Sequence, residues 1–108
     1  MTRSTAIREL NDAFRKSFSG GKVVMTASVD ALPEIVRANA LLEVTRFDAF
    51  SADNDPNGEH DFGSFELVGR KFFWKVDCYD ANMEFGSEDP SDPSKTTRVL
   101  TLMLAEDY

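Results

Sequence analysis

Apolar residues recur every three or four positions at the start of the chain, which is the spacing of one face of an α-helix. These positions are Ile7, Leu10, Phe14 and Phe18. The polar residues between them are expected to face solvent: Arg8, Glu9, Asp12, Arg15 and Lys16. Ser4 or Thr5 is a suitable N-cap, because its hydroxyl can accept a hydrogen bond from a free backbone N–H. The glycine pair at 20–21 is expected to end the helix.

Residues 22–29 (KVVMTASV) are rich in β-branched side chains and predict a first strand. Asp30 then resembles a helix N-cap, and Pro33 suits a first helical turn. Apolar residues at helical spacing continue to Phe47, so a second helix is expected over this stretch.

Asp, Asn, Pro and Gly dominate residues 48–61, and these residue types favour turns. The following residues predict a hairpin of strands 62–68 and 71–79. Gly69-Arg70 is the expected turn, because glycine can adopt the positive φ that a tight turn needs. One face of the second strand is wholly apolar and is expected to join the core: Phe72, Trp74, Val76 and Cys78.

Residues 80–95 predict a second polar loop, in which Pro90 and Pro93 favour an extended turn. The apolar run at residues 98–104 predicts a strand that is covered on both faces, as at the centre of a sheet. The expected order is helix, strand, helix and three strands. This order indicates an α+β fold with a mostly antiparallel sheet of about four strands, backed by two helices.

The composition is typical of one soluble domain over residues 1–108. Apolar residues make up 42% of the chain, enough for a packed core. The net charge of −7 repels phosphate and anionic lipid, so direct binding to nucleic acid or to a membrane is not expected. A single cysteine, no apolar leader and no apolar run of about 20 residues favour a cytoplasmic protein.

The negative charge is concentrated between Asp48 and Asp92. This segment holds 12 of the 19 acids and three of the 12 bases, a net charge of −9, whereas the rest of the chain carries +2. Two loops at one end of the hairpin would form one anionic surface for a basic protein partner. The candidate partner-binding residues are Asp53, Asp55, Glu59, Asp61, Asp80, Glu84, Glu88, Asp89 and Asp92. Alternatively, these acids only keep the loops soluble.

A second hypothesis is a metal site in the first loop, which would make the chain a metal-binding or metal-assisted enzyme domain. Its ligands would be Asp53, Asp55, Glu59, His60 and Asp61. Alternating oxygen ligands with Gly58 in sixth place match the first half of a calcium loop, but Ser64 stands where such a loop needs Glu. His60, the only histidine, could bind a transition metal or act as a general base. The simpler alternative is a histidine that is hydrogen-bonded to a nearby carboxylate or carbonyl.

Other catalytic chemistry is not indicated. Cys78 alternates with core residues and is expected to be a buried apolar residue rather than a nucleophile. No serine lies in a nucleophile elbow, and the glycines form no phosphate-binding loop. We therefore expect no catalytic residue and no cofactor, and we favour a binding module over an enzyme.

Four motifs occur in order along the last half to two-thirds of the chain: NDPNGEHDFG (54–63), FFWKVDCYD (72–80), GSEDPSDP (86–93) and TTRVLTLMLAEDY (96–108). They resemble the motifs of a bacterial family of unknown function, often found in alphaproteobacteria and on their plasmids. Cys78 stands where that family usually has tyrosine. The resemblance brings no activity, cofactor or catalytic residue with it.

What the resemblance implies is a bacterial cytoplasmic accessory protein carried on mobile DNA. Small acidic proteins in that setting often block host defence, because carboxylates can imitate DNA phosphates and occupy a basic channel. The expected function is therefore a non-enzymatic acidic interaction module, an inhibitor of the anti-CRISPR or anti-restriction kind. Its basic partner would be a nuclease or another nucleic-acid-binding protein.

Overall fold

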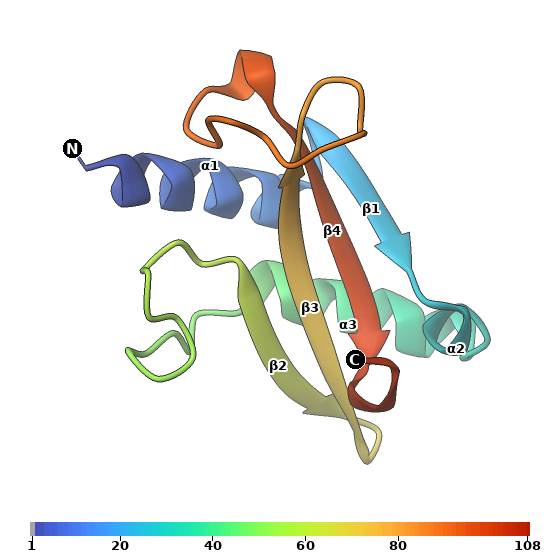
Figure 1. The fold of residues 1–108 in the computed structure, drawn as a ribbon. Coiled ribbons are helices and arrows are strands. Elements are labelled where there is room, and N and C mark those ends of the chain that lie inside the picture. Colours follow the sequence, from blue (N-terminus) through green and yellow to red (C-terminus); the bar gives the residue numbers. More distant parts are fainter. Residues whose placement is uncertain (1) are drawn as a thin grey trace.

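The computed structural model describes residues 2–108, and its centre is a four-stranded sheet in the order β1-β4-β3-β2 (Figure 1). The strands are β1 (Gly21–Met25), β2 (Phe62–Leu67), β3 (Arg70–Tyr79) and β4 (Thr97–Leu104). β1 pairs parallel with β4, whereas the β4–β3 and β3–β2 pairs are antiparallel. The predicted α+β fold, with a mostly antiparallel sheet of four strands, is therefore confirmed.

Helices cover one face of this sheet. Within residues 2–108 the α-helices are α1 (Arg3–Ser17), α2 (Ala27–Asp30) and α3 (Glu34–Arg46), one more than predicted. Two single-turn 3-10 helices, η1 (Pro93–Lys95) and η2 (Ala105–Asp107), flank β4. In Figure 1, α3 lies behind the strands, α1 extends to the left of them with its C-terminal end at the sheet, and α2 lies next to one end of α3. None of the helices in this part of the chain is long and apolar enough to cross a bilayer.

The predicted first strand at 22–29 is too long, because β1 ends at Met25. The next residues form α2, and its Val29 is fully buried in the core. Burial of this side chain beneath the sheet outweighs its β propensity on an edge strand. Thr26 is the N-cap of α2, and α3 begins after Pro33, so the prediction that Asp30 is an N-cap is wrong.

The ends of α1 and the hairpin turn also differ from the prediction. Thr2 is the N-cap of α1, and its hydroxyl accepts a hydrogen bond from the backbone N–H of Thr5 at 3.1 Å. The helix is closed by Phe18, which takes a left-handed φ of 56°, before the two glycines are reached. The hairpin turns at Val68 and Gly69, with φ values of 49° and 74°, one residue earlier than predicted.

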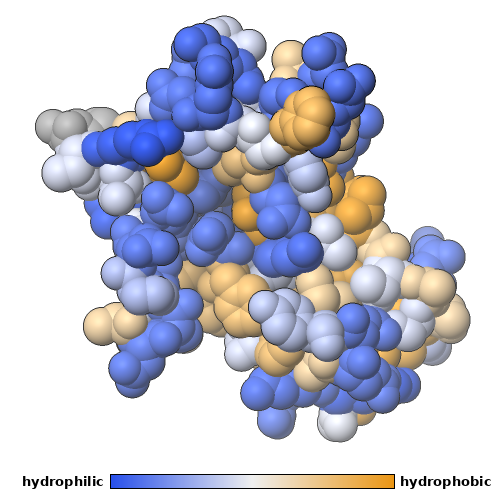
Figure 2. Space-filling view, in the orientation of Figure 1, coloured by the Kyte–Doolittle hydropathy of each residue, from blue (hydrophilic) through white to orange (hydrophobic). Residues whose placement is uncertain are grey.

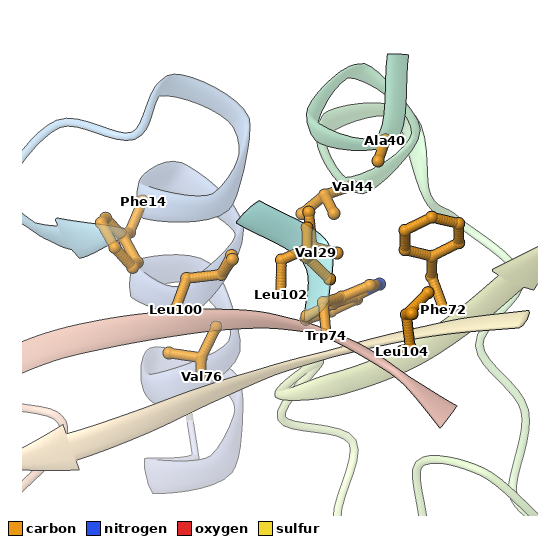
Figure 3. Packing of buried hydrophobic residues seen from close by; sticks show 10 residues of the cluster. All are labelled: Phe14, Val29, Ala40, Val44, Phe72, Trp74, Val76, Leu100, Leu102 and Leu104. Atoms are coloured by element: carbon orange, nitrogen blue, oxygen red, sulfur yellow. The ribbon is translucent and has the colours of Figure 1, made fainter. Parts of the chain in front are cut away.

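The hydrophobic core lies between the sheet and the helices (Figure 3). The sheet contributes Phe72, Trp74 and Val76 from β3 and Leu100, Leu102 and Leu104 from β4. The helices contribute Phe14, Val29, Ala40 and Val44. Gly63 in β2 faces the ring of Trp74, and a Cβ atom there would lie 2.5 Å from the indole Nε1. β4 is buried along most of its length, as expected for a central strand.

Candidate functional site

Two acidic loops leave the sheet at the same end of the β2–β3 hairpin. The first acidic loop (residues 48–61) leads into β2, and the second acidic loop (residues 80–96) follows β3. Figure 1 shows α1 running between them. Polar side chains of α1 contact both loops, and these contacts decide how each loop is held.

Arg15 fixes the start of the first acidic loop. Its side chain is 1% exposed, and its Nη1 donates to the carbonyl oxygens of Val44 at 2.8 Å and Phe47 at 2.9 Å. These carbonyls lie at the C-terminal end of α3, where backbone oxygens have no partner in the helix and a positive charge is favourable. Nη2 donates to Asp12 at 3.0 Å. The prediction that Arg15 faces solvent is therefore wrong, because the end of α3 and the first acidic loop bury its side chain.

His60 fixes the end of the same loop. Its Nδ1 lies 3.0 Å from both carboxylate oxygens of Asp12, and its Nε2 lies 3.6 Å from Oδ2 of Asp55. The imidazole also stacks on the ring of Phe50. The simpler of the two expectations, a histidine hydrogen-bonded to a nearby carboxylate, is confirmed.

Asp55 was a candidate for both a partner site and a metal site, but its side chain is only 6% exposed. Its Oδ1 accepts hydrogen bonds from the backbone N–H groups of Glu59 and His60, each at 3.2 Å. The carboxylate therefore closes the loop from inside and does not face a partner. Within residues 2–108, no three His, Cys, Asp or Glu side chains are close enough together to hold a metal ion.

A buried Asn11–Arg98 pair joins the two acidic loops to each other. Nε of Arg98 donates to Oδ1 of Asn11 at 2.7 Å, and the two residues are 4% and 1% exposed. Asn11 Nδ2 donates to the carbonyl oxygen of Glu59 in the first loop at 2.9 Å. An Nη atom of Arg98 donates to the carbonyl oxygen of Pro90 in the second loop at 2.7 Å. Because each loop gives one backbone carbonyl to the same buried pair, the loops have a fixed relative position.

Two acids of the second acidic loop stabilise its turns. Asp89 accepts hydrogen bonds from the backbone N–H and the hydroxyl of Ser91. Asp92 accepts the same two bonds from Ser94 and caps η1. These bonds lower the pKa of both carboxyl groups, because they favour the charged form.

The acids next to the Asn11–Arg98 pair are crowded. Desolvation is the largest cause of the raised pKa of Glu59, followed by repulsion from Asp61. Desolvation also raises the pKa of Asp61, and the charges of Asp55 and Asp77 add to the effect. The ionised forms of Glu59 and Asp61 are therefore less favourable in the folded protein than they would be in water.

Arg3 at the start of α1 lies between the two loops. Its positive charge offsets part of the raised pKa of Glu59 in the first loop. Its Nε is also 3.6 Å from a carboxylate oxygen of Asp89 in the second loop. Both loops are therefore near one exposed guanidinium, which places their carboxylates around a common region.

The remaining predicted site residues differ in exposure. Asp53, Asp61, Glu84 and Glu88 are exposed, and Glu59, Asp80, Asp89 and Asp92 are half-buried. Cys78 is half-buried, and burial raises the pKa of its thiol, so the thiolate is disfavoured. Reasoning from the sequence missed the residues that hold the loops: Asn11, Asp12, Arg15, Phe50 and Arg98. The sequence did indicate that Asn11 is buried, because this residue falls on the apolar face of α1, four residues after Ile7 and three before Phe14.

Comparison with known proteins gives one match. The model of a family described as "Protein of unknown function (DUF3768)" matches residues 25–107. No curated protein and no solved structure matches the chain. The matched range includes both acidic loops and β2, β3 and β4, whereas α1 lies outside it. Because the match covers well over half of the chain, this protein belongs to the family of proteins of unknown function described as DUF3768.

Proposed function

We propose that this chain is a non-enzymatic protein-interaction module, in which exposed and half-buried carboxylates of both acidic loops bind a basic protein. The observation that carries this proposal is the Asn11–Arg98 pair, which holds a backbone carbonyl of each loop. Loops fixed in this way lose little conformational entropy on binding, so less of the favourable electrostatic energy is offset and the affinity is higher. We call the set of partner-facing acids the acidic surface: Asp53, Glu59, Asp61, Asp80, Glu84, Glu88, Asp89 and Asp92.

The crowding of carboxylates supports a cationic ligand. A positive group placed beside Glu59 and Asp61 would offset the repulsion between carboxylates that, together with desolvation, raises their pKa. Binding should therefore be stronger at neutral pH, where both groups are charged, than in acid. The excess of negative charge in this part of the chain would also speed the encounter with a basic partner.

The partner class that we propose is a cytoplasmic nucleic-acid-binding protein, such as a nuclease of a host-defence system. Such proteins have basic channels that bind phosphates, and carboxylates on a fixed scaffold can occupy the same channel. In this reading the protein inhibits its partner by taking the place of DNA. Inhibition then requires no catalytic step by this chain.

The test is affinity capture with the immobilised chain, followed by identification of the captured protein and measurement of its affinity at several salt concentrations. We expect a basic nucleic-acid-binding protein whose affinity falls steeply with salt. The pair Asp53→Asn with Asp61→Asn, and the pair Glu84→Gln with Glu88→Gln, should each weaken binding several-fold.

The matched control is the pair Glu34→Gln with Glu43→Gln, which removes two exposed charges from α3. This variant has the same net charge as each loop variant, so it separates a local surface from a general charge effect. If all three double variants weaken binding equally, or none does, the acidic surface is not the binding site.

A further inference from the structure

The end of the second acidic loop next to β3 combines exposed apolar side chains with acids. Phe85 is 71% exposed and Met83 is 37% exposed. Glu84 lies between them in the chain, and Glu88 follows three residues after Phe85. Figure 2 shows apolar atoms standing among hydrophilic ones over the segment that follows β3.

This segment is held by backbone hydrogen bonds, so the exposure of Phe85 is part of a defined conformation. The N–H of Asp80 donates to the carbonyl oxygen of Phe85 at 2.7 Å, and the N–H of Met83 donates to the carbonyl oxygen of Asp80 at 3.0 Å. Oδ1 of Asp80 accepts from the N–H of Glu84 at 3.0 Å. Met83 takes a left-handed φ of 61°, which costs energy for a residue with a side chain. Gly86 then pairs with Tyr79, which anchors the segment to the end of β3.

A hollow of about 510 Å³ lies beside the ring of Phe85. Its charged lining residues are Asp80, Glu88 and Lys95. Nζ of Lys95 lies 3.5 Å from a carboxylate oxygen of Glu88, and both side chains are more than half exposed. An exposed pair of this kind is weak, so a cation from a partner can replace Lys95 at Glu88 at little cost.

From this arrangement we propose that the hollow binds an arginine side chain of the partner, stacked on the ring of Phe85 and hydrogen-bonded to Asp80 and Glu88. The inference rests on the proposed function and adds the chemistry of the contact. A planar guanidinium can stack on an aromatic ring and still direct several N–H groups to carboxylates in its plane. A lysine ammonium is more strongly hydrated and has no flat face, so it gains less from the ring.

The experiment compares two fluorescent peptides of equal charge and length, (Arg-Gly-Ser)4 and (Lys-Gly-Ser)4, titrated with the full chain. The arginine peptide should bind at least about threefold more tightly than the lysine peptide. Phe85→Ser should reduce binding of the arginine peptide to the level of the lysine peptide and leave the lysine peptide unchanged. Ile35→Ser is the control, because Ile35 is 68% exposed on α3.

Each outcome has one meaning. If both peptides bind equally and Phe85→Ser has no effect, arginine recognition is wrong. The proposed function would still be supported in that case if the double variant Glu84→Gln with Glu88→Gln lost binding of the peptides. If Phe85→Ser weakens both peptides equally, the ring is a general apolar contact and arginine selectivity is wrong. If neither peptide binds, arginine recognition is wrong, whereas the proposed function stands or falls with the affinity capture. A thermal melt of the Phe85→Ser variant that matches the wild type establishes that its effect is local.

Discussion

The imidazole of His60 lies parallel to the phenyl ring of Phe50, with ring centroids 3.7 Å apart and planes 4° apart. The two residues belong to opposite ends of the first acidic loop, so the stack closes it. His60 has a left-handed backbone φ of 54°, and the stack together with the Asp12 contact offsets the cost of that conformation.

Phe50→Ala should therefore loosen the first acidic loop. We expect a loss of about 2 kcal/mol in the free energy of unfolding, below the value for a fully buried Phe because Phe50 is half-buried. Hydrogen exchange at the amides of Glu59 and His60 should quicken, and urea denaturation gives the stability. Phe85→Ala is the control, and an equal loss in both variants would show that the stack contributes nothing.

Arg15→Met should strongly destabilise the fold. The change removes three hydrogen bonds at the end of α3: the carbonyl oxygen of Phe47 loses its Arg15 donor, and that of Val44 keeps only the 3.4 Å bond from the backbone N–H of Phe47. We expect a cost of about 3 kcal/mol, measured by urea denaturation. Lys16→Met removes the same charge from an exposed neighbour and should change stability by less than about 0.5 kcal/mol. Similar effects of the two changes would contradict the buried role of Arg15.

Asp61→Asn should stabilise the protein slightly at pH 7, by less than about 1 kcal/mol, since Asp61 is exposed. Its pKa is raised in the folded state, so the ionised carboxylate costs stability at neutral pH. As the pH falls through this raised pKa, the wild-type residue takes up a proton and the cost disappears. The advantage of the variant should therefore shrink as the pH approaches about 4, near the ordinary Asp pKa. Urea midpoints measured from pH 7 to pH 4 test this.

Asp107→Asn should show the opposite pH dependence and serves as the comparison. Hydrogen bonds from Ser28 and Thr26, and from the backbone N–H of Leu104, lower the pKa of Asp107. Its contribution to stability is present at neutral pH and is lost as the pH falls through that lowered pKa. The variant should be less stable than the wild type at pH 7, with the difference narrowing only in strong acid. A pH-independent difference would mean that the charge of Asp107 is not involved.

Gly63→Ala should disturb the packing of Trp74. The added Cβ would lie 2.5 to 2.8 Å from three atoms of the indole, which is too close for any real contact. We expect the free energy of unfolding to fall by about 2 kcal/mol and the tryptophan fluorescence to shift. At Gly69 an added Cβ would meet open space, but the backbone φ is 74°. Gly69→Ala should therefore lower the free energy of unfolding by about 1 kcal/mol without a fluorescence change. Unchanged fluorescence in the Gly63 variant would contradict the packing.

Periodicity predicted the strands and long helices well, because Phe72, Trp74 and Val76 alternate in β3 and most residues of β4 from 99 to 104 are apolar. It failed where burial comes from distant contacts. Val29 has the local composition of a strand, yet the core beneath the sheet places it in a helix. Arg15 has the local pattern of a solvent-facing residue, and it is buried only because α3 and the first acidic loop pack against it in the folded protein.

The candidate site was predictable only in outline. Counting charges located the two acidic loops, and the hairpin correctly placed them at one end of the sheet. The sequence could not separate Asp55, which is inside the loop, from Asp53, which is exposed two residues earlier. That difference depends on the hydrogen bonds of one turn, and periodicity carries no information about them.

The position of β4 has a consequence for synthesis of the protein. β4 pairs with both β1 and β3, yet its residues follow all the other strands in the chain. Before β4 has been synthesised, β1 has no partner strand, β3 is paired only with β2, and Trp74 lacks its neighbours on β4. The complete four-stranded sheet must therefore wait until residues 97–104 emerge, and until then apolar strand edges are exposed. We expect chaperones that bind nascent chains to protect this protein up to that moment.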